Sequence, residues 1–279
     1  MNQTNDTFLP NAFPAVWASE WGQDGYGLYM DLDCQGVRQR FRWILPGTFL
    51  MGSPESEPQR RKDEKQHEVT LTRGCWLADT ACTQALWFAV MNDNPAHFKG
   101  DMNHPVESVN WDKVQLFIDR LNHDYPDLSA CLPTEAQWEY ACRAGTTTPF
   151  SFGEQITPEQ VNYHGYYPYA RGKKGQCRQK TVPVKSLPPN PWGLYEMHGN
   201  VLEWCVDRYG AYPEHAVINP ADPEDGIGRV LRGGSWDSYG RDVRSADRSR
   251  LAPDYRSNVI GFRLALGRAG VRQDKVKGL

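Results

Sequence analysis

The sequence after Thr146 contains no stretch with the periodicity of an α-helix. Short apolar segments alternate there with Gly, Pro and Asn, residues that favour turns and interrupt regular structure. Such a segment cannot bury its apolar side chains along one helical face, so we expect a core of short strands and loops pinned by large side chains. The 10 tryptophans, 25 glycines and 20 prolines fit this loop-rich architecture.

The first half of the chain carries clearer signals of regular structure. Apolar and polar residues alternate, as in half-buried strands, over residues 27–33, 39–45, 48–51 and 67–72. Three helices are expected: one over 83–91, one that begins after Asn110, and one that begins at Thr134 with capping-box spacing. The second has an apolar stripe formed by Val114, Phe117, Ile118 and Leu121. The charged run at residues 55–66 is expected to be a solvated loop.

Charge and apolar content limit the classes of partner. The 31 basic and 34 acidic residues give a net charge of −3 and are spread along the chain, so nucleic acid is not an expected partner. No segment approaches about 20 apolar residues, and the N-terminus lacks the basic and apolar regions of a signal peptide. We therefore expect a cytoplasmic protein without a membrane span.

The sequence contains no common metal or nucleotide motif. The seven cysteines form no C-x-x-C pair, and we expect them to be buried small hydrophobes. The seven histidines form no H-x-x-H or H-x-x-x-H pair. No P-loop or G-x-G-x-x-G segment is present, and Ser235 does not lie in a G-x-S-x-G segment.

Six segments in fixed order resemble the formylglycine-generating, sulfatase-modifying enzyme family. They are WILPGTFLMGS (43–53), HPVESVNW (104–111), LPTEAQWEY (132–140), GLYEMHGNVLEW (193–204), RGGSW (232–236) and IGFR (260–263). The resemblance implies a C-type-lectin-like α+β fold with little regular secondary structure, a short twisted antiparallel sheet and two or three helices. The resemblance covers residues 40–266, which we expect to form one domain. Residues 1–39 are expected to be an N-terminal extension that packs on the core, with contact to a partner as the alternative. Residues 267–279, with two Arg, two Lys and little apolar content, are expected to be a flexible tail.

The same resemblance exposes a missing reactive group. In the enzymes, two cysteines after the Gly-Gly-Ser segment bind copper and activate oxygen, since soft thiolates select Cu(I). The nearest positions here are Ser238 and Gly240, and no cysteine follows Cys205. A serine hydroxyl cannot replace a thiolate as a Cu(I) ligand, so we expect no catalytic residues and no required cofactor.

The family also suggests calcium sites. The site near Asn162 lacks its downstream carboxylate, which would fall near Gln176. The other falls on Glu196, the backbone of Gly199 and Val201, and Glu203, where oxygen ligands remain. Structural calcium is one interpretation of these residues. In the other, Glu196 and Glu203 are hydrogen-bond acceptors beneath the loops.

Residues 236–259 also resemble the variable region of diversity-generating retroelement proteins. In those proteins, mutated template adenines convert asparagine codons into a restricted set that excludes Lys, Glu, Gln, Met and Trp. Residues 237–259 contain none of these five residue types. Asn258 would be an unmutated template residue.

We therefore expect a hypervariable ligand-binding surface in this region. Its expected members are Trp236, Asp237, Ser238, Tyr239, Asp242, Asp247, Ser249, Leu251, Ala252, Tyr255, Ser257, Asn258 and Val259. The tyrosines suit binding hot spots, the aspartates add charge selectivity, the serines offer adaptable hydrogen bonds, and Leu251, Ala252 and Val259 supply apolar contact. Trp236 is either an anchor for the ligand or a fixed scaffold residue.

The fixed residues around this surface need a structural role. Arg244, Arg248 and Arg263 are expected to tie the loops to backbone carbonyls or buried carboxylates. The hypothesis is a non-enzymatic display protein for a protein or other macromolecular ligand. The alternatives are an inactive family member with an ordinary solvated loop, and a protein-modifying enzyme or oxidoreductase with an altered active site.

Overall fold

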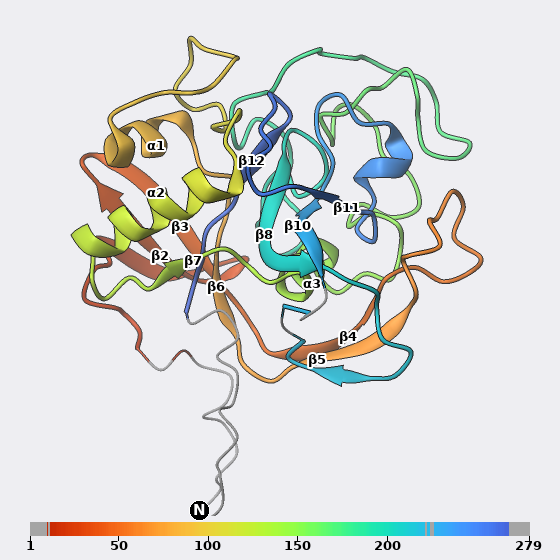
Figure 1. Ribbon diagram of the computed structural model, residues 1–279, viewed down its shortest axis with the longest axis horizontal. Coiled ribbons are helices and arrows are strands. Elements are labelled where there is room, and N and C mark those ends of the chain that lie inside the picture. The colour runs from red at the N-terminus through yellow and green to blue at the C-terminus, as the bar shows by residue number, and fades with distance from the viewer. Residues whose placement is uncertain (1–9, 11, 221, 224–225, 268–279) are drawn as a thin grey trace, which may run out of the picture.

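The computed structural model describes residues 10, 12–220, 222–223 and 226–267. In this part of the chain, α-helices and mostly antiparallel strands are combined in an α+β fold, as expected (Figure 1). No helix among the described residues is both long and apolar enough to cross a membrane.

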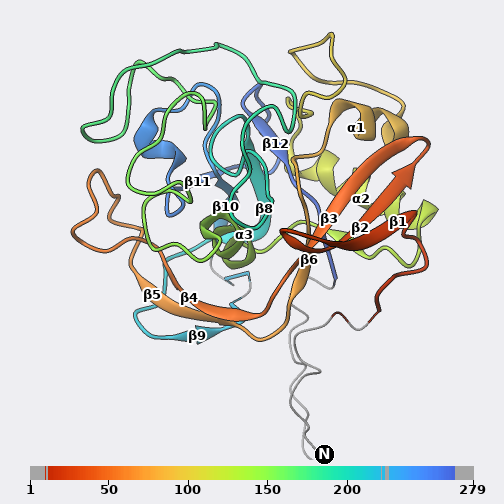
Figure 2. The same ribbon diagram turned by 180° about the vertical axis from the view of Figure 1, so that it is seen from behind.

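The largest sheet has six strands in the order β1-β2-β3-β6-β13-β7. Their bounds are β1 Glu20–Asp24, β2 Gly27–Cys34, β3 Val37–Ile44, β6 Cys75–Ala78, β13 Ala265–Leu266 and β7 Ala130–Cys131. Helices α1 (Gln84–Met91) and α2 (Trp111–Asp124) cover one face of this sheet, and Figure 2 shows the sheet from the opposite side. The last described strand, β13, lies between strands from the first half, so the C-terminal segment completes the sheet.

Two smaller sheets complete the fold. The four-stranded sheet has the order β11-β10-β8-β12, with bounds Arg248–Leu251, Ile227–Arg232, Leu202–Tyr209 and Ile260–Phe262. The three-stranded sheet joins β4 (Gly47–Met51), β5 (His67–Leu71) and β9 (Val217–Ile218). Helix α3 (Glu135–Arg143) lies between these sheets (Figure 1).

The expected helix starts are confirmed. Asn110 caps α2 by accepting a hydrogen bond from the Lys113 amide at 2.9 Å. Thr134 forms the capping box, since its hydroxyl accepts from the Gln137 amide while the Gln137 side chain accepts from the Thr134 amide. These signals lie within four residues of sequence, which is why the sequence alone identifies them.

Tryptophans occupy the centres of the packed regions. Trp87, Trp138 and Trp204 are fully buried. Trp87 stacks on Phe117 of α2 with ring centroids 5.2 Å apart, while the Trp204 indole donates to the Val109 carbonyl at 3.2 Å. After Arg143, the described part of the chain contains strands and loops and one short 3₁₀ segment, η1 (Gly240–Val243), as the lack of helical periodicity predicts.

The expected boundary between an N-terminal extension and the domain does not match a structural break. The boundary at residue 39 falls inside β3, and residues 29–34 of β2 pair with residues 37–42 of β3. Residues 20–39 are therefore part of the largest sheet. Apart from Gly267, the expected flexible tail lies outside the described residues.

The charged run at 55–66 departs from the expected solvated loop. Most of its side chains are at least partly exposed, but Glu57 and Glu64 are buried. Both carboxylates accept from the Arg244 guanidinium, at 2.6 Å for Glu57 and 2.7 Å for Glu64. A charged side chain is buried only when a partner neutralises it, and this partner lies about 180 residues away in sequence.

A buried carboxylate on α3 holds three segments together. Glu139 is fully buried and accepts from the Gly52 amide at 2.8 Å, from Arg143 Nε at 2.9 Å and from the Arg232 guanidinium. It thereby joins the end of β4, its own helix and the end of β10.

We expect Glu139→Gln to destabilise the protein by about 3–5 kcal/mol, because it removes the nearest counter-charge from the buried guanidinium groups of Arg143 and Arg232. Urea denaturation measures the free energy of unfolding. Glu20→Ala is the control, since it removes an exposed pair with Arg38 and is expected to cost less than about 1 kcal/mol. Equal losses for the two variants would contradict the role assigned to Glu139.

Candidate functional site

The predicted variable segment starts where β10 ends. Gly233 and Gly234 turn the chain there with φ values of 90° and 68°. A Cβ on Gly234 would lie 2.5 Å from a Val243 methyl group and 2.6 Å from the Asp242 carbonyl oxygen, so only glycine permits this close approach. Trp236 follows this turn and is half-buried.

Trp236 joins the two ends of the segment. Its indole donates to the Asn258 carbonyl at 3.1 Å, and its amide donates to the Asn200 carbonyl at 3.0 Å. The ring also packs edge-on against Phe98, with centroids 5.4 Å apart. These contacts suit the scaffold interpretation of Trp236, although part of its side chain stays exposed.

The predicted surface residues differ in exposure. Four are exposed: Asp237, Tyr239, Ala252 and Tyr255. Eight are half-buried: Trp236, Ser238, Asp242, Ser249, Leu251, Ser257, Asn258 and Val259. Leu251 and Val259 pack against the main core, so they form the base of the surface.

Asp247 is the exception, because it is buried with 5% of its surface exposed. It ion-pairs with Arg61 at 2.9 Å, and Arg61 also contacts the Asp242 carboxylate at 2.7 Å. Burial raises the pKa of Asp247 to about 7, while Arg61 and Arg244 oppose the shift. The expectation that Asp247 is displayed to a ligand is therefore corrected: it lies beneath Arg61.

The exposed positions fall into two groups. Asp237 to Asp242 lie against the loop at residues 164–169, where the His164 amide donates to the Ser238 carbonyl at 2.9 Å. Ala252 to Ser257 lie against the start of α2, where the Trp111 amide donates to the Pro253 carbonyl at 2.9 Å. The Trp236–Asn258 hydrogen bond connects the groups.

The positions nearest the enzymes' cysteine pair have no redox chemistry. The Ser238 hydroxyl accepts from the Ser235 amide at 2.9 Å. A Cβ on Gly240 would lie 2.3 Å from the Tyr169 nitrogen, so this backbone leaves no space for a side chain there. Burial raises the pKa of the Cys142 thiol to about 12, so it is not a thiolate at neutral pH.

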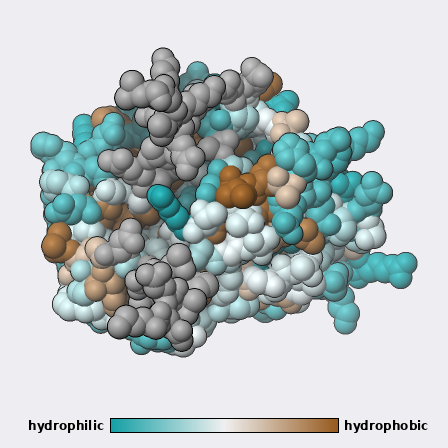
Figure 3. Space-filling model, turned by 90° about the horizontal axis from the view of Figure 1, so that it is seen from below, coloured by the Kyte–Doolittle hydropathy of each residue, from teal (hydrophilic) through white to brown (hydrophobic). Residues whose placement is uncertain are grey.

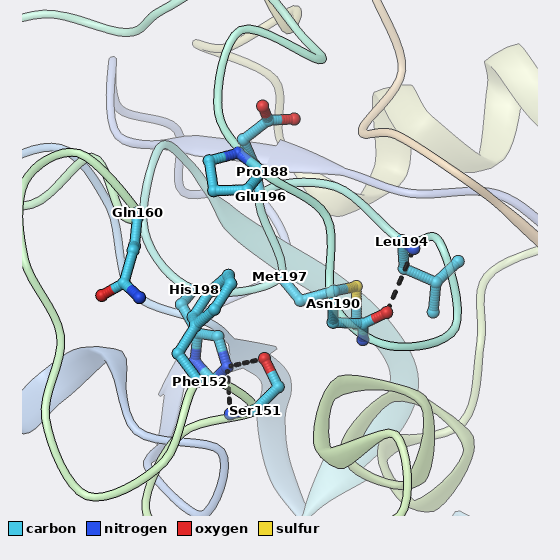
Figure 4. A pocket seen from close by; sticks show the side chains of 9 residues that line it. All are labelled: Ser151, Phe152, Gln160, Pro188, Asn190, Leu194, Glu196, Met197 and His198. Carbon is cyan, nitrogen blue, oxygen red and sulfur yellow. Dashed lines mark hydrogen bonds between the residues drawn. The ribbon is translucent and has the colours of Figure 1, made fainter. Parts of the chain in front are cut away.

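Beneath the segment lies a narrow crevice around His198 (Figure 4). His198 donates from Nδ1 to the Val243 carbonyl at 2.8 Å, and its Nε2 accepts from the Ser151 amide at 3.1 Å. Burial lowers the pKa of His198 to about 4, so the ring is neutral. The crevice leaves no room for a water molecule. Because His198 donates to the carbonyl of Val243, the last residue of η1, its ring supports this 3₁₀ segment.

The suggested calcium ligands have other partners. Both Glu203 oxygens accept from Arg263, at 2.9 and 3.0 Å, and one also accepts from the Trp138 indole. Glu196 accepts long hydrogen bonds from the Lys185 and Leu187 amides. A calcium ion would have to displace Arg263, so these residues fit the hydrogen-bond-acceptor interpretation better than a calcium cage.

The arginine prediction is confirmed at all three positions. Arg244 pairs with Glu57 and Glu64, Arg248 forms two hydrogen bonds with the Glu135 carboxylate, and Arg263 pairs with Glu203. Each guanidinium is buried. Three residues beside the variable segment, Arg61, Tyr166 and Tyr167, were not predicted from the sequence. The consecutive tyrosines in a Gly- and Pro-rich loop were the available signal.

A larger cavity lies away from the predicted surface. It measures about 370 Å³ beside β9 and the start of α3, and its lining includes Met51, Asp207 and Arg248 but no predicted surface residue. Figure 3 views the molecule from this end, where apolar residues occur in small groups among hydrophilic ones. Burial raises the pKa of Asp207 to about 7.

One protein family matches most of the chain. A model of the family described as sulfatase-modifying factor enzyme 1-like domain matches residues 31–268. The formylglycine-generating enzyme of Streptomyces coelicolor is 38% identical over 176 residues, which cover 60% of this chain and 54% of that enzyme. The Mus musculus enzyme is 35% identical over 198 residues, covering 64% of this chain and 50% of that enzyme. The chain thus spans about half the length of these curated relatives.

Two solved structures share the fold over most of the chain. Treponema denticola variable protein 1 superposes with a TM-score of 0.76 and 26% identity, covering 85% of this chain and 98% of that protein. PvdO from Pseudomonas aeruginosa superposes with a TM-score of 0.69 and 24% identity, covering 90% and 99%. The expected formylglycine-generating-enzyme-type, lectin-like fold is confirmed.

Calcium is expected to leave the thermal stability unchanged. Since Arg263 already neutralises Glu203, millimolar calcium or a chelator should shift the midpoint of thermal unfolding by less than about 1 °C. Magnesium at the same concentration controls for ionic strength. A rise with calcium alone would show that the ion displaces Arg263.

Asp207 is expected to make the protein less stable as pH rises. The pKa of Asp207 is about 7 in the folded protein and exceeds the ordinary value of 3.8. Its contribution to the free energy of unfolding is therefore complete below about pH 4 and is lost as the pH rises to about 7. Asp207→Asn should reduce the loss of unfolding free energy between pH 5 and 8 by about 2–3 kcal/mol, at 1.36 kcal/mol per pKa unit. Urea denaturation at both pH values measures this difference; identical profiles would contradict it.

Proposed function

Because the chain belongs to the sulfatase-modifying factor enzyme 1-like domain family but has no cysteine after Cys205, we propose that it is a non-enzymatic ligand-binding display protein. In this proposal it is the variable protein of a diversity-generating retroelement, and residues 236–259 carry its hypervariable surface. The similarity to Treponema denticola variable protein 1 supports this assignment.

The observation that carries the proposal is the separation of exposed and buried groups within one segment. Asp237, Tyr239 and Tyr255 are exposed, whereas Arg244 and Arg248 between them are buried in ion pairs. Exposed side chains tolerate substitution within about 0.5 kcal/mol, while the buried pairs keep the backbone in place. Such an arrangement permits many ligand-binding surfaces on one fold.

The surface composition favours a protein or another macromolecule as the ligand. Tyrosine, aspartate and serine are typical of adaptable binding surfaces, and the narrow crevice below them admits no small molecule. The net charge of −3 offers no general attraction for nucleic acid. We place the protein in the cytoplasm and assign it no required cofactor.

A protein-modifying enzyme or oxidoreductase with an altered active site is the competing function. It is favoured by the sequence similarity to formylglycine-generating enzymes. Ser238 and Gly240 argue against retention of their chemistry, because neither can ligate Cu(I) as a thiolate does.

The DNA flanking the gene tests the display proposal. We expect a reverse-transcriptase frame and a near-copy of codons 236–263 that differs mainly at adenines. The mismatched codons should fall among the predicted surface residues other than Trp236, which the restricted set excludes, and Asn258, which would be an unmutated template residue. The codons of Arg244 and Arg248 should match between the copies. Absence of both the frame and the near-copy would reject the retroelement assignment.

A biochemical control separates the two function classes. The display protein should neither bind Cu(I) tightly nor oxidise a cysteine-containing sulfatase-type peptide. Turnover of that peptide by the copper-loaded protein would favour the enzyme instead.

A further inference from the structure

We propose that Tyr166 and Tyr167, which lie outside the variable segment, are constant members of the ligand-binding surface. This inference rests on the proposed display function and adds fixed binding residues to it. Both side chains are about half exposed, at 53% and 51%. The partner that they fit is a protein that places apolar side chains or guanidinium groups against the tyrosine rings.

Tyr167 adjoins an exposed position of the variable segment, and Tyr166 packs edge-on against the neighbouring His164 ring at 5.5 Å. The Tyr167 and Tyr239 rings have centroids 4.3 Å apart, and the His164 ring lies edge-on to Tyr239 at 6.0 Å. Tyr239 is itself 40% exposed. A ligand that covers position 239 therefore also meets Tyr167, and Tyr166 contacts the same His164 ring that Tyr239 contacts.

Backbone hydrogen bonds hold the two loops together. The His164 amide donates to the Ser238 carbonyl at 2.9 Å, and the Gly240 amide donates to the Tyr167 carbonyl at 2.8 Å. These bonds do not depend on the side chains at positions 237–239. The tyrosines consequently keep their place beside the segment when those side chains change.

The tyrosine loop is also anchored on its other side. Tyr169 is buried, packs edge-on against Phe150 at 5.1 Å, and donates its hydroxyl to the Pro58 carbonyl at 2.9 Å. Gly240 permits the close contact with this loop, since a Cβ there would lie 2.3 Å from the Tyr169 nitrogen. The preceding tyrosines are thus presented by a fixed backbone, which lowers the entropy cost of ligand binding.

The test uses a library of the full chain. The exposed positions 237, 239, 252 and 255 are randomised, the library is displayed on cells, and binders are selected against purified streptavidin and, separately, against egg-white lysozyme. Each binder is then remade with Tyr166→Ala or Tyr167→Ala. Tyr167→Phe tests the ring alone, and Ile218→Ala on β9 is a matched control, since this side chain is 68% exposed and lies outside the predicted surface.

We expect Tyr166→Ala or Tyr167→Ala to raise the Kd at least about tenfold for most binders to both proteins, as truncation of a hot-spot tyrosine does. Tyr167→Phe and Ile218→Ala should change the Kd less than about twofold. The midpoint of thermal unfolding should stay unchanged in all four variants, which separates lost contacts from lost folding.

The outcomes distinguish this inference from the function on which it depends. Binders whose affinity is unaffected by both alanine substitutions would overturn the role of the tyrosines and leave the display function intact. A library that yields no binder to either protein would overturn the display function, and the inference with it.

Discussion

Buried ion pairs between arginines of the last third and earlier glutamates determine where that part of the chain lies. The pairs are Arg232 with Glu139, Arg244 with Glu57 and Glu64, Arg248 with Glu135, and Arg263 with Glu203. A buried guanidinium without its carboxylate is costly by several kcal/mol, so each pair disfavours any other placement of its strand or loop. Regular secondary structure is sparse between residues 144 and 201, and these pairs supply much of the missing constraint.

This arrangement explains how one segment can combine a fixed backbone with changeable side chains. The contacts that hold residues 236–259 come from buried groups and from backbone hydrogen bonds, including those of Trp236 and Gly240. Side chains that point to solvent make few of these contacts, so their substitution changes the free energy of unfolding little. Asp242 and Asp247 differ, because both ion-pair with Arg61 of the charged loop, and changes there affect that loop as well.

Several elements could be predicted because their causes are local. The caps at Asn110 and Thr134 and the apolar stripe of α2 depend on residues a few positions apart, and the structure has them as expected. Part of the candidate surface was also predicted from the sequence: Asp237, Tyr239 and Tyr255 are exposed in the structure, as expected. The burial of Glu57 and Asp247 was not predictable, because it depends on arginines that only tertiary contacts bring close.

The sequence by itself determined the family, the loop-rich second half and the absence of a thiol at the cysteine positions of the related enzymes, since these follow from residue identities and their order. Only the tertiary structure decided which charged residues are buried, that Glu203 is committed to Arg263, and that Tyr167 lies against Tyr239. The physical reason is that burial and charge pairing depend on distances in space. Tyr167 and Tyr239 meet through backbone hydrogen bonds between loops that no local pattern relates.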